Sequence, residues 1–286
     1  PLVSSFMLST KDGKKAWVET KIDPTAEDGY RFEVKTGSLS KADEAKLKDG
    51  TIGRSSGGIC VLSGATMPFS YVRQEGQTTG LGLRLMGIVA EGQRGRTYLS
   101  PAADHVSAAE AAKPAWEPDG ELPNNPRDFK TPNYGLSTFA SLFTPRQLTA
   151  LTTFSDLVGV ARERALKDAL AAGLADDGIP LHAGGVGALA YADAIATYLS
   201  FAISKVANIG SSITSWMSDR GAFRETFARQ AIPMVWDFAE ANPFVDAGGS
   251  LASAIDKGAM AVAEAPACSP GSIRNLAAQS NSFSDE

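Results

Sequence analysis

The chain has 286 residues, of which 43% are hydrophobic, and a formal net charge of -5 at pH 7 with a pI near 5.2. This length and apolar content allow at least one substantial core, in one large domain or two smaller ones. The acidic balance excludes a protein that holds nucleic acid by overall attraction, because phosphate binding needs concentrated Lys and Arg. Any nucleic-acid surface must therefore be local.

The cysteines and the first residues bear on the cellular compartment. Cys60 and Cys268 lie far apart and lack the dense spacing of a secreted disulfide scaffold, which favours a reducing cytoplasm. The first fifteen residues, "PLVSSFMLSTKDGKK", contain only a short apolar patch, so we expect no signal peptide. The prediction is a cytoplasmic protein.

Residues 1–100 predict a small β-rich region. Segments that alternate or run apolar are separated by Gly, Asp-Gly and Pro, as in "AWVETKI", "YRFEVKT", "TIGR", "ICVLSG", "FSYVR", "LGLRLMGIVAEG" and "RTYL". Residues 39–50, "LSKADEAKLKDG", interrupt this pattern as a charged insertion, either a short exposed helix or a loop tip. The insertion is a poor candidate for a functional site.

Residues 101–135 predict an extended, proline-rich connector. An Ala-rich start is followed by Pro114, Pro118, Pro123, Pro126 and Pro132. Prolines at this density leave little room for regular structure. The last part, "LPNNPRDFKTPNYG", offers groups that could bind a nucleic-acid strand or a flipped base, namely Arg127, Lys130, Asn133 and Tyr134. A rigid connector, in which Asn and Asp residues only close turns, is an equally open interpretation.

Residues 136–286 predict a mainly helical region. Thr144 can cap a helix, Pro145 suits its first position and Gly173 can end it. Between them apolar residues recur at a spacing of three or four, which is typical of one buried helix face. Further helices are expected over about 186–208 and 212–230. A strand in "AIPMVWDF" and a last weak helix in "SLASAIDKGAMAVAEA" follow.

The segment 183–203, "AGGVGALAYADAIATYLSFAI", is long enough to cross a bilayer. Small and hydroxylated residues dominate it, and its central Asp193 would cost about 2.5 to 3.5 kcal/mol in a membrane. We therefore expect a buried central helix and no membrane association.

Residues suited to catalysis or metal binding are sparse. His105 and His182 lie in loop-like sequence, and neither is expected to act as a base. In "GGICVLSGATMPFSYVR", Cys60 and Ser63 have the spacing of a zinc knuckle, but serine is not a zinc ligand, so no metal site is expected. No phosphate-binding or dinucleotide-binding glycine motif is present.

The run "PMVWDFAEANPF", residues 233–244, ends in two acidic residues and an Asn-Pro corner. Asp237, Glu240 and Asp246 could supply paired carboxylates for hydrolysis, although their spacing does not place two of them on one face. A loop that leaves an apolar strand, with Asn242 and Pro243 in a turn, is the simpler interpretation.

Three longer blocks carry a resemblance to a known family: "ELPNNPRDFKTPNYG", "LFTPRQLTALTTFSDLV" and "RQAIPMVWDFAEANPF". Together with "KKAWVE" and "IVAEGQRGRTYL", they resemble the DUF1156-type adenine-specific DNA methylases, bacterial and archaeal proteins that also contain a zinc-ribbon region. The similarity extends over most of the chain. It implies methylation of adenine N6 with S-adenosylmethionine, on a base that has left the stack.

The resemblance also implies that the reactive motifs lie elsewhere. The chain contains no Asp-Pro-Pro-Tyr, the motif that binds the target amino group in such enzymes, and "ANPF" lacks the second proline. In the family the glycine-rich cofactor loop precedes the region that corresponds to Pro1 and the residues after it. We therefore expect the central, DNA-facing segment of the enzyme, inactive alone, with S-adenosylmethionine bound only by the full-length protein. Cys60 and Ser63 would be the remnant of one cysteine pair of the zinc ribbon.

The expected fold is α+β: a small β-rich, degenerate zinc-ribbon-like region, then a mainly helical region with one or two strands of an incomplete Rossmann-like methyltransferase. The expected DNA contacts are Arg127, Lys130, Asn133, Tyr134, Arg146, Arg220, Arg224 and Arg229. Asp237 and Asn242 are expected to line the methylase cleft. The expected partners are DNA and the remainder of the methyltransferase.

Two alternatives remain open. The first is a non-catalytic scaffold or partner-binding module of an anti-phage complex, in which the helices of residues 144–230 pack against other proteins. The acidic pI and the balanced charges of that region favour it. The second is a metal-binding regulator that binds zinc through Cys60.

Overall fold

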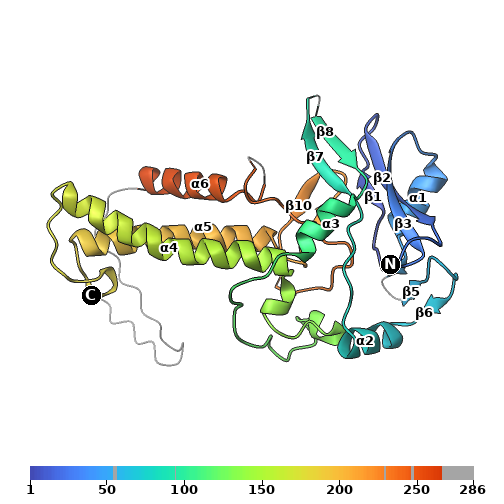
Figure 1. Ribbon diagram of the computed structural model, residues 1–286, viewed down its shortest axis with the longest axis horizontal. Helices are drawn as coiled ribbons and strands as arrows, with labels where there is room; N and C mark the ends of the chain where they lie inside the picture. Colours follow the sequence, from blue (N-terminus) through green and yellow to red (C-terminus); the bar gives the residue numbers. More distant parts are fainter. Residues whose placement is uncertain (54–56, 94, 229, 246–247, 266–286) are drawn as a thin grey trace, which may run out of the picture.

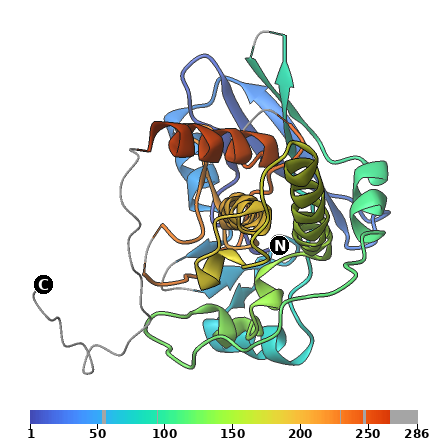
Figure 2. The same ribbon diagram turned by 90° about the vertical axis from the view of Figure 1, so that its left-hand side faces the viewer.

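The computed structural model describes residues 1–53, 57–93, 95–228, 230–245 and 248–265. The fold is α+β, as the sequence predicts. Small antiparallel sheets gather at one end of an elongated molecule, and a bundle of three helices forms an arm at the other end (Figure 1). A view along the long axis shows the three helices side by side (Figure 2).

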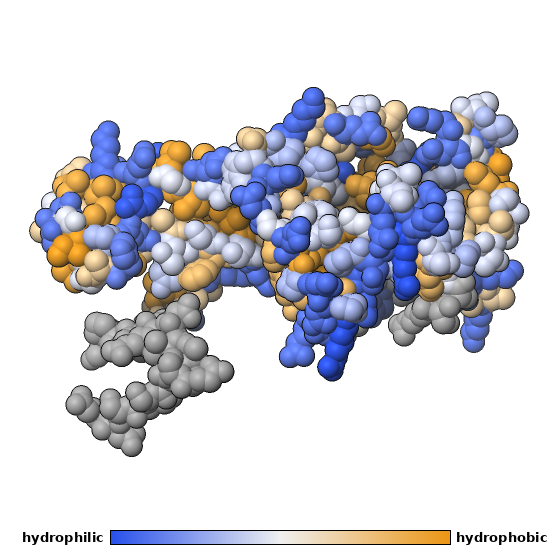
Figure 3. All heavy atoms as spheres, turned by 90° about the horizontal axis from the view of Figure 1, so that it is seen from below, coloured by the Kyte–Doolittle hydropathy of each residue, from blue (hydrophilic) through white to orange (hydrophobic). Residues whose placement is uncertain are grey.

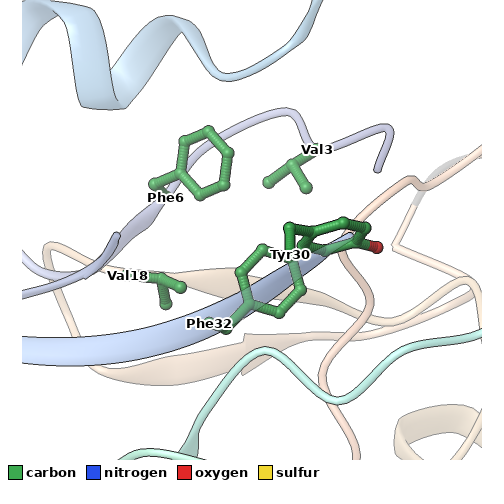
Figure 4. Packing of buried hydrophobic residues seen from close by; sticks show 5 residues of the cluster. All are labelled: Val3, Phe6, Val18, Tyr30 and Phe32. Carbon is green, nitrogen blue, oxygen red and sulfur yellow. The ribbon is translucent and has the colours of Figure 1, made fainter. Parts of the chain in front are cut away.

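The N-terminal sheet is formed by β1 (Met7–Ser9), β2 (Lys15–Ile22) and β3 (Tyr30–Gly37), paired antiparallel in that order. Alternation along the strands turns apolar side chains to one face, where Val3, Phe6, Val18, Tyr30 and Phe32 form a buried cluster (Figure 4). The charged insertion is helix α1 (Lys41–Asp49), capped by Ser40, and its Leu47 packs against this cluster.

A second small sheet consists of β4 (Ile52–Gly53), β5 (Gly57–Ile59) and β6 (Thr66–Met67). The prediction of a strand in "FSYVR" is wrong, because these residues begin helix α2 (Phe69–Thr78). Val72 and Gly76 are buried at a spacing of four, and both face the rest of the protein. The apolar run was too short for its periodicity to separate a strand from a helix.

Two strands, β7 (Ile88–Gly92) and β8 (Gly95–Leu99), form an antiparallel ribbon. Residues 81–87, part of the strand-like segment "LGLRLMGIVAEG", have no regular structure. In the connector, the short helix α3 (Ala103–Glu110) and the 3-10 turns η1 (Thr131–Tyr134) and η2 (Ala140–Leu142) flank irregular chain. The low content of regular structure predicted for residues 101–135 is therefore correct for its central part.

The arm consists of α4 (Pro145–Ala171), α5 (Ala188–Ile209) and α6 (Leu251–Glu264), with the short turn η3 (Leu181–Ala183) before α5. These are the predicted first, second and last helices. None of the helices in the described ranges combines the length and the apolar content that crossing a bilayer requires. Helix α5 is buried on one side only, because Tyr191, Tyr198 and Phe201 are more than half exposed.

The predicted helix over 212–230 is wrong. The segment forms a hairpin of β9 (Ser215–Met217) and β10 (Ala222–Arg224), closed by Gly221 with a φ of 63°. Buried hydroxyls also hold the chain in place, with Ser211 Oγ 2.6 Å from Thr226 Oγ1. Side-chain hydrogen bonds of this kind compete with helix formation.

The strand predicted in "AIPMVWDF" is also not formed. Ile232 and Phe238 each make one isolated bridge, with Phe129 and Ser215 respectively. Every sheet in the described part of the chain is antiparallel, so the expected Rossmann-like strands are not found there. The bridge between Phe129 and Ile232 is parallel, but it is a single pair.

Candidate functional site

A broad cleft of about 2890 Å³ opens between the N-terminal sheet and the arm. Its walls are β3, residues 81–91, helix α3, the start of α4 and residues 234–245. The predicted cleft residues Asp237 and Asn242 both line it, as does Arg146.

The blocks that carry the family resemblance are joined directly beside this cleft. The Lys130 N–H donates to the Ile232 carbonyl at 3.0 Å, and the Ile232 N–H donates to the Asp128 carbonyl at 2.7 Å. The rings of Tyr134 and Trp236 meet edge to face, with centroids 5.0 Å apart. The first and third blocks are therefore connected by backbone and by aromatic contact.

The second block is connected through the start of α4. Thr144 and Gln147 form a capping box: the Thr144 hydroxyl accepts from the Gln147 N–H, and the Gln147 side chain accepts from the Thr144 N–H. The Thr144 hydroxyl also lies 3.4 Å from the Glu240 carboxylate, which forms an ion pair with Arg146. We call residues 128–134, 144–147 and 232–240 the block junction.

Asp237 is a half-buried carboxyl group at the wall of the cleft. Its Oδ2 accepts from the Ser5 N–H at 3.2 Å, and Ser4 also donates to it. Burial raises the pKa of the Asp237 carboxyl, and the hydrogen bonds from Ser4 and Ser5 oppose this rise. The contacts join the third block to the N-terminal segment, which gives Asp237 a structural role.

The Asn-Pro corner forms the turn that the simpler interpretation predicts. The Asn242 side chain accepts from the Phe244 N–H at 3.0 Å. The Phe244 ring meets Phe154 of α4 edge to face, yet Phe244 remains 78% exposed. Among the described carboxylates of this corner, Glu240 is paired with Arg146 and Asp237 accepts a hydrogen bond from the Ser5 N–H.

The predicted contacts of the connector fall into two groups. Arg127 and Lys130 are exposed, whereas Tyr134 is only 7% exposed. Arg73 and Trp236 both pack on the Tyr134 ring, so the expectation that this ring stacks on a base does not fit its position. Asn133 is half-buried, and its carbonyl accepts from Gln77.

Turn-closing contacts also exist in the connector. The Asn125 side chain accepts from the Arg127 N–H at 3.1 Å and donates to Asp128 at 2.8 Å. The Lys130 ammonium donates to the Pro126 carbonyl. The rigid-connector interpretation is thus supported for the Asn and Asp residues, while the charged ends of Arg127 and Lys130 still face solvent.

The other predicted cations do not gather at one place. Arg146 is engaged by Glu240, whereas Arg220 and Arg224 lie exposed on the β9–β10 hairpin. Arg229 lies outside the described residues, as does Asp246. Of the predicted DNA contacts within the described residues, Arg146 alone lines the cleft.

The turn between β5 and β6 contains Cys60. Hydrogen bonds from the Ser63 hydroxyl and from the backbone N–H groups of Ser63 and Leu62 lower the pKa of the Cys60 thiol to about 7. No group of three potential metal ligands occurs in the described ranges. Cys268 lies outside them.

Two contacts between an arginine and an aromatic ring were not predicted from the sequence. Arg73 of α2 lies over the Tyr134 ring, with its guanidinium carbon 5.7 Å from the ring centroid. Arg96 of β8 lies over the Trp216 ring at 5.5 Å from that centroid. Both pairs join segments that are far apart in the chain. A helical interpretation of "FSYVR" would have placed Arg73 and Phe69 on one face, which was the only available hint.

Comparison with known proteins identifies no relative: no family model, no curated protein and no solved structure matches the chain.

Proposed function

We propose that this chain is the DNA-facing central segment of an S-adenosylmethionine-dependent adenine-N6 DNA methyltransferase. The block junction is the observation that supports this most. Segments that resemble the methylases and lie far apart in sequence are bonded to one another, through Lys130 and Ile232 and through Arg146 and Glu240.

The cofactor enters the proposal only through the resemblance. S-adenosylmethionine would supply the methyl group in the full-length protein, and we assign no residue of the described chain to it. The exposed cations Arg127, Lys130, Arg220 and Arg224 are the candidates for phosphate contact. An enzyme that modifies chromosomal or phage DNA acts in the cytoplasm, in a restriction-modification or anti-phage role.

The first test is duplex binding by the 286-residue chain. Fluorescence anisotropy with a labelled, adenine-containing duplex should show binding. The logarithm of the association constant should fall linearly with the logarithm of the salt concentration between about 50 and 200 mM. An unlabelled duplex should compete, and an uncharged polymer should not. Absence of binding at about 50 mM salt would contradict the proposal.

The second test is methyl transfer. With labelled S-adenosylmethionine and duplex DNA, the isolated chain should give no N6-methyladenine, whereas the full-length protein should give it. Product from the isolated chain would show that the reactive motifs are not needed. Failure of the full-length protein to modify adenine in any duplex would overturn the enzyme assignment itself.

One observation favours the scaffold alternative. Apolar side chains are exposed along the arm, over α4, α5 and the segment between them, and many gather at its far end (Figure 3). The most exposed of these are Leu157, Val160, Leu170, Leu174, Ile179, Leu181, Val186, Tyr191, Tyr198 and Phe201. Such a surface is typical of contact with another protein. A chain that co-purifies with a protein partner and is not retained on DNA would favour this alternative over DNA contact.

A further inference from the structure

Three hairpin turns from distant parts of the sequence meet at one edge of the molecule. The Thr10 N–H, in the turn between β1 and β2, donates to the Ser218 carbonyl in the turn between β9 and β10, at 3.0 Å. A Cβ atom built on Gly95 would lie 3.7 Å from the Lys14 Nζ, so the β7–β8 turn lies beside the β1–β2 turn. Both views show these two turns on the same side (Figures 1 and 2).

We call residues 10–15, 92–93, 95–96 and 218–221 the hairpin-tip surface. It carries four exposed cations: Lys11, Lys14, Arg96 and Arg220. Within the described chain, no carboxylate lies within ion-pair distance of the first three of them.

Three carboxylates reduce the positive charge of this edge. Asp12 and Asp219 lie in the turns themselves, and Glu91 lies opposite Arg96 on the ribbon. The Arg220 Nε lies 3.7 Å from the Asp219 Oδ2, with both side chains at least 70% exposed. An exposed pair of this kind holds its partners weakly, which leaves Arg220 available to another anion. The edge keeps an excess of cations in a chain whose net charge is -5.

Arg96 is held in place without losing its donors. Its guanidinium lies 5.5 Å from the centroid of the Trp216 ring, and the Trp216 Nε1 donates to the Leu8 carbonyl at 2.7 Å. Gly221 gives the guanidinium room, since a Cβ at that position would collide with its Nη1 atom. A guanidinium stacked on an aromatic ring keeps N–H groups that can bind a phosphate.

The β7–β8 ribbon has the shape that a DNA groove admits. It is a two-stranded antiparallel ribbon that rises from the body of the molecule (Figure 1). Strand β8 is largely exposed, and Gln93 and Thr97 near the turn offer side-chain donors and acceptors to solvent. The major groove accepts a two-stranded ribbon, whose side chains can reach base edges.

We infer that the hairpin-tip surface binds the phosphate backbone of double-stranded DNA, with the β7–β8 ribbon directed into a groove. This inference rests on the proposed function and specifies which face of the segment holds the duplex. Lys11, Lys14, Arg96 and Arg220 contact phosphates, and the ribbon between them sets the register on the DNA. The cations of the connector, Arg127 and Lys130, lie outside this surface and serve as the competing hypothesis.

The experiment compares three double variants in the anisotropy assay: Lys11→Gln with Lys14→Gln, Arg127→Gln with Lys130→Gln, and, as a charge-matched control, Lys41→Gln with Lys46→Gln on α1. Each removes two exposed positive charges. The hairpin variant should lower the magnitude of the salt slope by about 2, because each lost phosphate contact lowers it by about 1. The control should leave the slope unchanged.

Lysine acetylation of the wild-type chain, with and without duplex, gives a reading that does not depend on variant folding. DNA should protect Lys11 and Lys14 and leave Lys41 and Lys46 modified. One outcome is that the wild-type chain binds DNA while only the Arg127→Gln, Lys130→Gln variant shows a smaller salt slope. That result overturns the inference and leaves the proposed function standing. If wild type binds no duplex, both are overturned. Equal acetylation of all four lysines on bound protein also overturns the inference.

Discussion

The half-buried carboxyl group of Asp237 makes the stability of the fold depend on pH. Burial raises its pKa in the folded chain, so folding favours the protonated form over the charged one. Its contribution to stability is therefore present below the carboxyl pKa of the unfolded chain. That contribution is lost as the pH rises through the folded pKa, and at neutral pH the buried charge weakens the fold.

Asp237→Asn should stabilise the protein at neutral pH. The amide oxygen can still accept from the Ser5 N–H, and no charge is buried. We expect a rise of roughly 2 to 4 °C in the unfolding midpoint at pH 7, the shift that about 1 kcal/mol produces in a domain of this size. Calorimetry from acid to neutral pH should show the gain disappearing toward low pH. A gain of equal size at every pH would exclude the titration of Asp237 as its cause.

A second residue-scale prediction concerns the Cys60 thiol. Because the Ser63 hydroxyl is the main cause of its pKa near 7, Ser63→Ala should return the pKa toward its usual value near 8.5 and slow alkylation at pH 7 by up to about tenfold. Iodoacetamide labelling in a Cys268→Ser background measures the rate. Ser137→Ala, an exposed change elsewhere, serves as the control. Identical rates in all three proteins would contradict the role of Ser63.

At the scale of elements, we expect replacement of glycine by alanine to have opposite effects on stability in two helices. Gly76 in α2 lies against η1, where a Cβ would come 2.5 Å from the Tyr134 carbonyl oxygen. Gly159 in α4 is exposed, and a Cβ there meets nothing within 4 Å. Gly76→Ala should destabilise by about 1 to 3 kcal/mol through overpacking. Gly159→Ala should stabilise by about 0.5 to 1 kcal/mol through helix propensity.

Urea denaturation of both variants checks this pair of predictions. The opposite signs are the informative result, because a general effect of alanine would move both midpoints in one direction. Near-ultraviolet circular dichroism should also change for Gly76→Ala, since Tyr134 and Trp236 pack next to the altered contact. An unchanged spectrum and midpoint would mean that α2 shifts freely away from η1.

The elements differ in how well the sequence predicted them. Helix α4 was predictable because cap, first proline, apolar spacing and terminal glycine all agree, and the structure has Thr144 as the cap and Gly173 with a φ of 87°. The prediction of a helix over 212–230 was wrong because only the spacing of apolar residues supported it. Gly221 and the hydroxyls of Ser211 and Thr226 favour a hairpin there.

The candidate site was predictable only in part. Asp237 and Asn242, which the family resemblance implied for a methylase cleft, line the broad cleft beside the arm. The sequence could not show that Tyr134 is buried, because the side chains that cover it, Arg73 and Trp236, come from elements distant in the chain. Nor could it show that Arg146 is paired with Glu240. Contacts between distant segments depend on tertiary packing, which local patterns do not contain.

On the scale of the whole molecule, Trp216 joins segments that are far apart in the chain. Its Nε1 donates to the Leu8 carbonyl at 2.7 Å, its ring lies under Arg96, and Phe223 meets it edge to face at 5.5 Å. Trp216→Phe keeps an aromatic ring but removes the donor and weakens the cation–π contact. The loss should be about 1 to 2 kcal/mol.

Limited proteolysis and denaturation together check this prediction. In Trp216→Phe, cleavage near β1 and near the β7–β8 ribbon should become faster, whereas cleavage near η3, at the far end of the arm, should keep its wild-type rate. Trp116→Phe is a matched control, because Trp116 is exposed and its Nε1 donates only to Asp156. Equal effects of the two substitutions would contradict a special role for Trp216.

The bond between Ser5 and Asp237 has a consequence for biosynthesis, because it joins residues 232 positions apart. A ribosome that adds about 5 to 20 residues per second takes roughly 10 to 50 seconds to make the chain between them. During that interval the nascent N-terminal sheet must wait with this contact unmade, exposed to chaperones and proteases. Completion of the contact between Ser5 and Asp237 therefore follows synthesis of the third block.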